Sequence, residues 1–291
     1  MHNLELFNNI KPSPKTRVVN VASVPQRSPF RYPGGKTWLI PVVRKWLGFS
    51  RRPQTILVEC FAGGGIVSLT AAFENLAGRV IMIELDEEVA AAWETILGED
   101  NGWLADKIFS FELTRENVEK ELANDKRSAR ENGFRTILKN RILHGGIIAK
   151  GSGFIKTGEN GKGISSRWYP KTIRDRLLAI AAVKHKISFI RGDAFKIAES
   201  YINEQRFCFF IDPPYTVAGK RLYTHYEIDH DRLFHMASRI KGNFLMTYDD
   251  SPEIRGLAEK YSFPYVAVPM KTTHHRQKME LLISINFDWL D

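Results

Sequence analysis

The sequence predicts an α/β protein whose doubly wound, mostly parallel sheet is interrupted by a basic and largely helical insert. Short apolar runs alternate with helical patterns at both ends of the chain, which is typical of a parallel sheet. Between these two parts lies a glycine-rich, basic segment of different character. The chain has 291 residues, of which 43% are apolar and 26% are charged. These values indicate a folded protein with a sizeable core.

The N-terminal part contains one predicted strand–helix–strand unit. Residues 1–28 carry prolines and scattered basic residues without periodicity, so we expect a flexible arm. The elements expected after it are a helix over Lys36–Leu47, a strand over Thr55–Phe61, a helix over Ile66–Leu76, a strand over Val80–Ile83 and a helix over Glu87–Ile96. Glycines 63–65 make the turn between the first strand and its helix.

Residues 103–186 form the predicted insert. A charged helical stretch over Thr114–Arg130 is followed by a glycine-rich, basic stretch and by a helix over Thr172–Val183. Strand patterns then return, and the elements expected are strands over Ile187–Ile190, Phe207–Ile211, Asn243–Thr247 and Glu280–Asn286 and a helix over His230–Ile240. Residues 29–102 and 187–291 are therefore predicted to form one α/β domain around the insert.

The formal net charge of +9 comes almost entirely from the middle of the chain. Residues 101–190 hold 18 basic and 9 acidic side chains, whereas the parts before and after are close to neutral. From Gly133 to Ile190 there are 12 basic residues against only Glu159 and Asp175. Such a segment favours binding of a polyanion, and the alternative is an ordinary solvated face.

Several classes of protein are excluded by composition. No window approaches the stretch of about 18 apolar residues that spans a membrane, and the first residues lack the apolar core of a signal peptide. Cys60 and Cys208 cannot form a disulfide framework, so we expect a reducing, cytoplasmic setting. The only adjacent histidine pair, His274-His275, has no carboxylate or cysteine at ligand spacing, so no metal site is expected.

The first motif is the loop Glu59-Cys60-Phe61-Ala62-Gly63-Gly64-Gly65. Glycines at a strand-to-helix turn let a cofactor approach the backbone, and the acidic Glu84, 19 residues after Gly65, is placed to hold ribose hydroxyls. Ser68 stands where the dinucleotide pattern requires a third glycine. The loop therefore favours an adenosine cofactor other than NAD, and the alternative is a purely structural turn.

The second motif is Asp212-Pro213-Pro214-Tyr215, directly after the strand Phe207–Ile211. Two prolines stiffen the turn, so that the carboxylate of Asp212 and the carbonyl of Pro213 form two neighbouring acceptors. An exocyclic amino group offers two matching N–H donors. Tyr215 supplies an aromatic face on which a base can stack. The motif therefore predicts a site for the amino group of a nucleobase, and the alternative is a rigid proline turn.

Three motifs in this order make the sequence resemble the Dam-type (D12 class) family of DNA adenine-N6 methyltransferases. They are Tyr32-Pro33-Gly34-Gly35-Lys36, the loop Glu59–Gly65, and Asp212-Pro213-Pro214-Tyr215 after an insert. The resemblance covers roughly residues 29–287. It implies a Rossmann-like class I methyltransferase fold, S-adenosylmethionine as cofactor and double-stranded DNA as partner. Residues 29–102 and 187–291 would form the methyltransferase domain, and 103–186 the target-recognition insert.

The resemblance also implies a role for each matching residue. The methionine end of the cofactor would lie against Tyr32, Pro33, Gly34, Gly35 and Lys36, with Lys36 suited to the carboxylate. Glu59 would lie near the ammonium, Glu84 would bind the ribose, and the pocket would be shaped by Phe61, Ala62, Gly63, Gly64 and Gly65. Asp193 would contact the adenine amino group of the cofactor and Phe195 its ring. The target base would be held by Asp212, Pro213, Pro214 and Tyr215. The sequence departs from the family at Ala194, which separates Asp193 from Phe195, and at Cys60, where the family usually has proline.

The insert would position and read the DNA. The basic residues that we expect to contact it are Arg135, Lys139, Arg141, Lys150, Lys156, Lys162, Arg167, Lys171 and Arg174. Phosphate contacts give affinity without sequence information, whereas arginine can read guanine. Arg141 and Arg167 are the candidates for a base contact. The recognition sequence does not follow from the chain.

Alternatives to adenine-N6 methylation stay open. A cytosine-N4 methyltransferase usually carries serine at the position of Asp212, and an RNA methyltransferase or an inactive DNA-binding relative are further hypotheses. A cytosine-C5 mechanism needs a cysteine after a proline, and neither cysteine follows one. We expect a monomer or weak dimer. Whether a cognate restriction enzyme accompanies the protein, as in restriction-modification, is left open.

Overall fold

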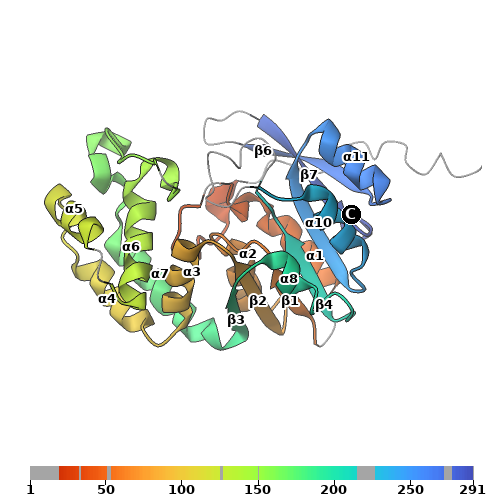
Figure 1. The fold of residues 1–291 in the computed structure, drawn as a ribbon, viewed down its shortest axis with the longest axis horizontal. Helices are drawn as coiled ribbons and strands as arrows, with labels where there is room; N and C mark the ends of the chain where they lie inside the picture. Colours follow the sequence, from red (N-terminus) through yellow and green to blue (C-terminus); the bar gives the residue numbers. More distant parts are fainter. Residues whose placement is uncertain are drawn as a thin grey trace, which may run out of the picture.

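The computed structural model describes residues 20–32, 34–50, 54–124, 127–149, 151–214, 227–271 and 277–290. Its seven strands form one sheet in the order β3-β2-β1-β4-β5-β7-β6 (Figure 1). The strands are β1 (Ile56–Glu59), β2 (Arg79–Glu84), β3 (Ile187–Arg191), β4 (Phe207–Ile211), β5 (Asn243–Asp249), β6 (Tyr265–Lys271) and β7 (Gln277–Ser284). Strands β1 to β5 pair in parallel, and β7 is antiparallel to both β5 and β6. This order confirms the predicted doubly wound sheet of the Rossmann-like class I methyltransferase fold.

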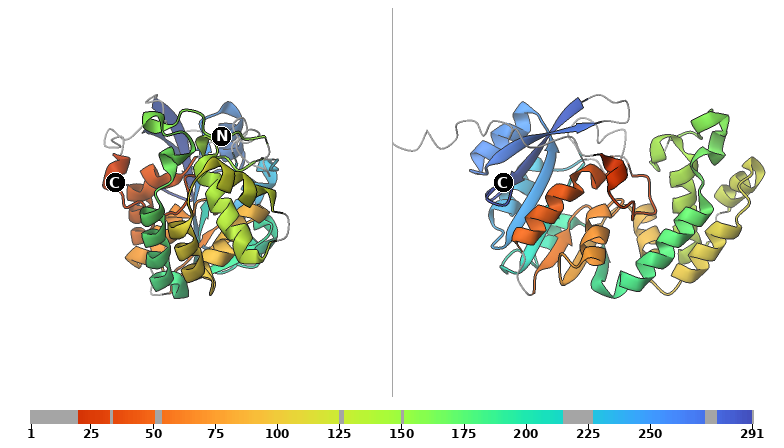
Figure 2. Two further views of the ribbon diagram at one scale, coloured as in Figure 1. Left: turned by 90° about the vertical axis from the view of Figure 1, so that its left-hand side faces the viewer. Right: turned by 180° about the vertical axis from the view of Figure 1, so that it is seen from behind.

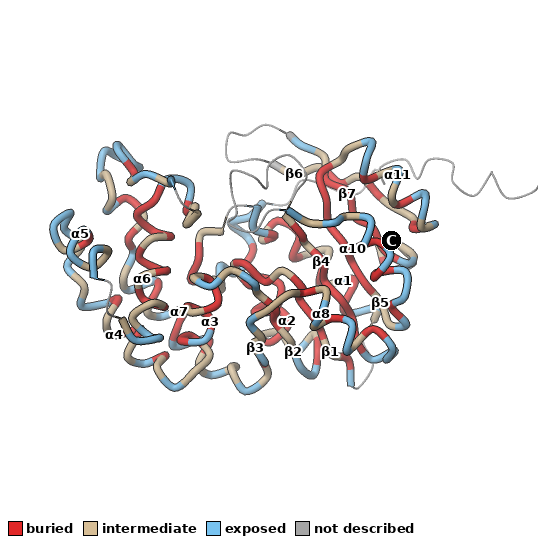
Figure 3. Tube along the Cα trace, in the orientation of Figure 1, coloured by how far each residue is buried: buried red, intermediate tan, exposed pale blue. Residues whose placement is uncertain are grey.

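Helices cover both faces of the sheet. One face packs against α1 (Ile40–Phe49), α2 (Ile66–Glu74) and α3 (Glu87–Leu97), and the other against α8 (Ala194–Ala198), α10 (His230–Ser238) and α11 (Pro252–Lys260). All five residues of β4 are buried, as expected for a central parallel strand that is covered on both sides (Figure 3). Trp46 and Trp93 are buried in the core on the face covered by α1, α2 and α3. Phe209 and Phe244 are buried in the core on the opposite face.

A helical region lies beside the β3 edge of the sheet (Figures 1 and 2). It consists of α4 (Asn101–Ser110), α5 (Arg115–Ala123), α6 (Ala129–Ile142) and α7 (Pro170–Val183). Short 3-10 turns occur at η1 (Val21–Ser23), η2 (Lys36–Leu39), η3 (His144–Gly146), η4 (Glu159–Gly161), η5 (Gly163–Arg167) and η6 (Lys184–Lys186). Phe134 on α6 and Leu177 on α7 belong to the same buried cluster as Trp93 on α3. The helical region therefore shares its core with the sheet domain.

Some expected elements differ from those in the structure. The helix expected over Thr114–Arg130 is shorter in the structure: α5, which Thr114 caps, ends at Ala123. A separate helix, α6, begins after Ser128, which forms a capping box with Glu131. Strand β7 begins and ends earlier than the expected Glu280–Asn286. The elements that were not predicted include α4, α8, α11, β6 and nearly all of α6. Strand β6 contains Pro269, which an edge strand tolerates.

The described residues contain neither a membrane-spanning helix nor a cluster of metal ligands. Within the ranges that the structure describes, no helix is both long and apolar enough to cross a membrane. The same residues contain no group of three or more His, Cys, Asp or Glu side chains arranged to hold a metal ion. Cys60 and Cys208 are both buried and unbonded to each other.

Candidate active site

The candidate site lies at the point of the sheet where the chain changes direction. From β1 the chain passes outward to β2 and β3, and it then returns to place β4 on the other side of β1. Open α/β sheets bind ligands at such a switch point, beyond the carboxyl ends of the strands. A pocket of about 310 Å³ opens there, which is within the range of small-molecule sites.

The pocket brings together most of the residues that the sequence singled out. The predicted site residues that line it are Tyr32, Gly34, Gly35, Lys36, Glu59, Phe61, Ala62, Gly63, Gly64, Gly65, Glu84, Asp193, Phe195, Asp212 and Pro214. Pro213 is buried and is not among the residues that line the pocket. Pro33 and Tyr215 lie outside the described residues, so their predicted roles stay predictions.

The loop after β1 can be built only from glycine at two positions. Gly63 and Gly65 have φ values of +45° and +63°, in the left-handed region. A Cβ atom on Gly63 would lie 2.6 Å from the ring of Tyr32, and one on Gly65 would lie 2.6 Å from the ring of Trp93. The indole Nε1 of Trp93 donates a hydrogen bond of 2.8 Å to the carbonyl of Gly63. Backbone conformation and close packing therefore both require the glycines.

Glu84 fixes the glycine loop to the end of β2. Its Oε2 accepts a hydrogen bond of 2.8 Å from the amide of Gly63, and its Oε1 accepts from the amides of Leu85 and Asp86. Burial raises the pKa of this carboxyl more than the three hydrogen bonds lower it. Each carboxylate oxygen can accept more than one hydrogen bond, so Glu84 can still bind hydroxyl groups in the pocket.

Glu59 is the last residue of β1, and the residue is 3% exposed. Its Oε2 accepts a hydrogen bond of 3.0 Å from the amide of Ser68 in the first turn of α2. Burial raises the pKa of Glu59 to about 8 despite this hydrogen bond. A cationic group bound in the pocket would favour the ionised form of this residue.

Lys36 and Asp212 form an ion pair in which Lys36 is buried and Asp212 is partly exposed to the pocket. Nζ of Lys36 lies 2.8 Å from Oδ1 of Asp212 and donates a hydrogen bond of 3.0 Å to the carbonyl of Gly34. The hydroxyl of Thr247 on β5 donates a bond of 2.7 Å to the same Oδ1, and Oε2 of Glu280 on β7 lies 3.9 Å from Nζ. Lys36 was expected at the cofactor carboxylate, and its pairing with Asp212 was not predicted. Thr247 and Glu280 were also missed, although a glutamate within the apolar run of β7 was a visible signal.

Asp193 and Phe195 lie next to each other at the start of α8. Oδ1 of Asp193 accepts a hydrogen bond of 2.8 Å from the amide of Phe195, so Asp193 caps the helix. The guanidinium of Arg232 lies 4.7 Å from the centre of the Phe195 ring. Both predicted residues therefore face the pocket, and Asp193 also has a structural role.

Arg141 does not lie where the sequence analysis placed it. We expected a DNA contact, but Arg141 is 3% exposed and its guanidinium donates a hydrogen bond to the carbonyl of Pro29. Burial lowers its pKa to about 9, and nearby cationic side chains act in the same direction. The side chain is therefore enclosed between α6 and the N-terminal segment, which contradicts the prediction.

The loop after α6 contributes to the pocket, which the sequence did not indicate. Gly146, Ile147 and Ile148 line the pocket together with Asp212. Asn140 on α6 donates a hydrogen bond of 2.8 Å to the carbonyl of Gly146 and is also bonded to Arg31. The helical region therefore supplies one wall of the candidate site.

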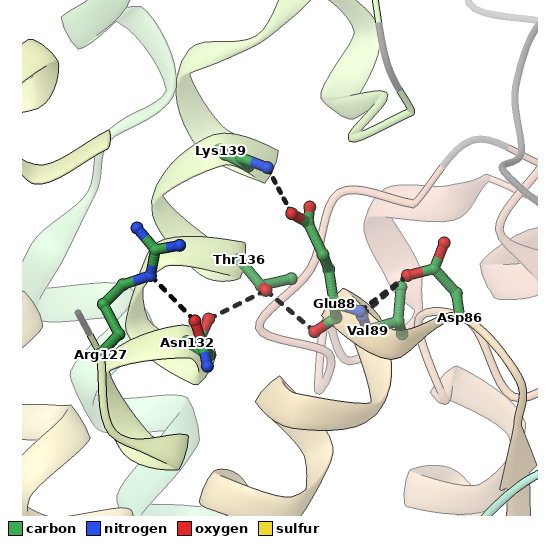
Figure 4. A network of polar contacts seen from close by, with 7 residues as sticks. All are labelled: Asp86, Glu88, Val89, Arg127, Asn132, Thr136 and Lys139. Atoms are coloured by element: carbon green, nitrogen blue, oxygen red, sulfur yellow. Dashed lines mark hydrogen bonds and ion pairs between the residues drawn. The ribbon is translucent and has the colours of Figure 1, made fainter. Parts of the chain in front are cut away.

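The other basic candidates differ in what they already contact. Lys139 on α6 pairs with Glu88 on α3 at 2.5 Å, within a network that joins the two helices (Figure 4). Lys171 pairs with Asp175 and Arg174 with Asp106, all on exposed or half-buried surface. The remaining candidates divide into the exposed Lys156 and Lys162, the half-buried Arg135 and Arg167, and Lys150, which lies outside the described residues. Contact of these residues with DNA stays a prediction.

Comparisons with known proteins give similarity to solved structures alone. No family model matches the chain, and no curated protein matches it. The rRNA methyltransferase aviRa from Streptomyces viridochromogenes is 14% identical with a TM-score of 0.40, over 87% of this chain and 86% of that one. The N-terminal domain of human METTL16 in complex with SAH is 8% identical with a TM-score of 0.41, over 85% and 68%. An rRNA methylase from Streptococcus thermophilus is 8% identical with a TM-score of 0.36, over 84% and 93%. The fold assignment rests on the strand order of this chain.

Proposed function

We propose that this chain transfers a methyl group from S-adenosylmethionine to the N6 amino group of a flipped-out adenine in double-stranded DNA. The position of Asp212 carries the proposal. This carboxylate follows β4 at the switch point of a class I methyltransferase sheet, and it lines the same pocket as the glycine loop and Glu84. Two prolines follow it directly.

The residues around the glycine loop fit the cofactor. Glu84 is placed at the end of β2 to accept hydrogen bonds from ribose hydroxyls, and the buried Glu59 suits the ammonium of the methionine part. Phe195 and Leu85 offer apolar surface for the adenine ring. S-adenosylmethionine would supply an electrophilic methyl group on a sulfonium. Gly63 and Gly65 line the pocket with backbone atoms, which a cofactor can approach closely.

Asp212 would hold the target amino group. Its carboxylate accepts an N–H of the amine, which orients the nitrogen lone pair and stabilises the positive charge that develops on nitrogen. The new N–C bond forms as the C–S bond breaks, and the extra proton then leaves the nitrogen for solvent. Because the amino group is inaccessible in a duplex, the base must first be flipped out, at a cost of a few kcal/mol.

The basic helical region favours a nucleic acid as the substrate. Residues 101–190 carry 18 basic and 9 acidic side chains, and the loop Gly146–Ile148 of this region borders the pocket. A duplex bound on this region would therefore lie close to the reacting groups. Candidate DNA contacts among the described residues are Lys156, Arg167, Lys171 and Arg174.

Transfer of a labelled methyl group tests the proposal. The purified chain is incubated with labelled S-adenosylmethionine and, separately, with duplex DNA, single-stranded DNA and RNA, and the methylated nucleoside is identified by mass spectrometry. We expect N6-methyldeoxyadenosine from duplex DNA. Recovery of N4-methylcytosine, transfer to RNA alone, or DNA binding without transfer would each reject the proposal and indicate one of the alternatives.

A further inference from the structure

Glu280 is a buried carboxylate without an assigned role in the proposed methyl transfer. It lies in the middle of β7, opposite Val268 of β6 and Asp249 of β5, and it is 2% exposed. It does not line the pocket, so it cannot touch a bound cofactor or base. Its link to the site is Lys36, whose Nζ lies 3.9 Å from Oε2.

The surroundings of Glu280 are unfavourable for stability alone. Its strand neighbour Asp249 is 8% exposed, and within the described ranges Oδ1 of Asp249 has no hydrogen-bond partner. Like charges directly opposite each other on paired strands are destabilising, and a buried charge costs free energy unless it is compensated. A second carboxylate beside one ammonium is therefore better explained by an effect on the site.

The charge balance at Asp212 indicates what that effect is. Lys36 and Asp212 alone form a neutral pair, which has little attraction for a positive charge nearby. Burial lowers the pKa of Lys36, but the attraction of Asp212 and Glu280 outweighs burial, and the net shift is upward. With Glu280 included, the three groups carry one net negative charge next to the place where the target nitrogen becomes positive.

The geometry also shows how Glu280 acts at a distance. Lys36 reaches Asp212 through Oδ1, the same atom that Thr247 contacts from β5. Glu280 attracts the same ammonium from β7, the strand that pairs with β5. The position of Nζ is therefore set by two carboxylates and the carbonyl of Gly34, and the orientation of Asp212 follows from the position of Nζ.

We propose that Glu280 is a positioning residue for methyl transfer, which offsets the charge of Lys36 so that Asp212 retains its negative field toward the target amine. The inference rests on the proposed function, because it concerns the step in which the amine becomes cationic. It assigns a role to a strand that none of the three sequence motifs includes. The expected consequence is a change in turnover without a change in binding.

The test compares Glu280→Gln and Glu280→Asp with the wild-type chain in the methyl-transfer assay on duplex DNA. We expect Glu280→Gln to lower kcat by about 10-fold to 100-fold. This is less than the loss of about 100-fold to 1,000-fold on removing a group that contacts the developing charge directly, because Glu280 acts through Lys36. The KM values for S-adenosylmethionine and DNA should change less than about threefold, because Glu280 touches neither substrate. Glu280→Asp keeps the charge, so its kcat should stay within about fivefold of the wild-type value.

Controls separate charge from folding. Glu199→Gln removes an exposed glutamate that pairs with Arg239 at 3.6 Å, and it should leave kcat unchanged. Thermal unfolding of every variant checks the fold. If Glu280→Gln does not fold, the kcat of Glu280→Asp tests the proposal. A kcat within about fivefold of the wild-type value supports the role of the charge, and a larger loss overturns it.

The outcomes distinguish this inference from the proposed function. A wild-type kcat in folded Glu280→Gln overturns the role of Glu280, as does a loss that Glu280→Asp shares in full, since packing would then be the cause. Absence of transfer from the wild type to any DNA rejects the proposed function itself. Transfer by the wild type with normal turnover in Glu280→Gln rejects only the inference.

Discussion

Asn140 on α6 binds both backbone polar groups of Arg31. The amide of Arg31 donates a hydrogen bond of 2.8 Å to Oδ1, and Nδ2 donates one of 3.1 Å to the carbonyl of Arg31. The same Nδ2 donates to the carbonyl of Gly146. One buried amide thus joins the segment before Tyr32, helix α6 and the loop that closes the pocket.

We therefore predict that Asn140→Ala weakens both stability and cofactor binding. Loss of the amide leaves buried backbone groups without partners, at a cost of about 1–3 kcal/mol each. Because Tyr32 follows Arg31 directly, its ring should lose its place over Gly63. Denaturant unfolding and calorimetric titration with S-adenosylmethionine measure the two effects. Asn117→Ala, on the exposed surface of α5, is the matched control, and an unchanged cofactor affinity in Asn140→Ala would contradict the prediction.

Gly63→Ala is expected to disrupt the cofactor loop. The residue has a φ of +45°, and an added Cβ would lie 2.6 Å from the ring of Tyr32. Strain at such a φ and displacement of the ring should together destabilise the fold by about 1–3 kcal/mol and abolish cofactor binding.

Gly102→Ala provides the control for this substitution. Gly102 lies in α4 with no atom near the added Cβ, and alanine is the better helix former by about 1 kcal/mol. Thermal unfolding should therefore show opposite shifts for the two variants. Equal stability of Gly63→Ala and the wild type would refute the requirement for glycine.

The sequence predicted the parts of the site that follow strand ends. Residues such as Glu84 and Asp212 stand directly after apolar runs, so the parallel sheet brings them to one edge. Contacts between distant segments were not predictable in this way. Thr247, Glu280 and Asn140 act through partners that are far away in the chain, and Arg141 looked like a surface residue because a basic run says nothing about which side faces the core. Strand β6 was missed because Pro269 interrupts its pattern.

Glu59 should make the stability depend on pH. The pKa of its carboxyl is raised to about 8 in the folded protein from an ordinary value of 4.5, because the group is buried. Between these values the folded protein retains a proton that the unfolded chain has released. The free energy of unfolding should therefore be highest near the lower value and decrease as the pH rises toward about 8.

Glu59→Gln tests this dependence. The variant has no carboxyl to titrate, so its stability should decrease less than that of the wild type over the same pH interval. Urea unfolding of both proteins at several pH values gives the comparison. Parallel curves for the two proteins would show that Glu59 does not titrate in this interval.

Asp212→Asn is expected to lower the rate of methyl transfer by about 100-fold or more, since the amide lacks the negative charge that stabilises a cationic amine. Cofactor affinity should be retained, because the cofactor residues Glu59 and Glu84 are unchanged. Asp250→Asn, at a half-buried aspartate that pairs with Arg255 at 2.7 Å, is the control for a charge-to-amide change. Single-turnover rates with saturating cofactor separate chemistry from binding, and an undiminished rate in Asp212→Asn would remove this residue from the mechanism.

The basic region can be tested by its effect on DNA affinity alone. The double variant Arg167→Ala and Lys171→Ala removes two cations from opposite ends of the short link between η5 and α7. If both contact phosphates, DNA binding should weaken and the slope of log affinity against log salt should fall by about 2, since each contact contributes about 0.9. Cofactor affinity should not change, because neither residue lines the pocket.

The matched control is Arg239→Ala with Lys241→Ala on the sheet domain, which removes the same charge and should leave DNA affinity unaltered. Equal losses in the two double variants would indicate that net charge, and not the helical region, determines DNA binding.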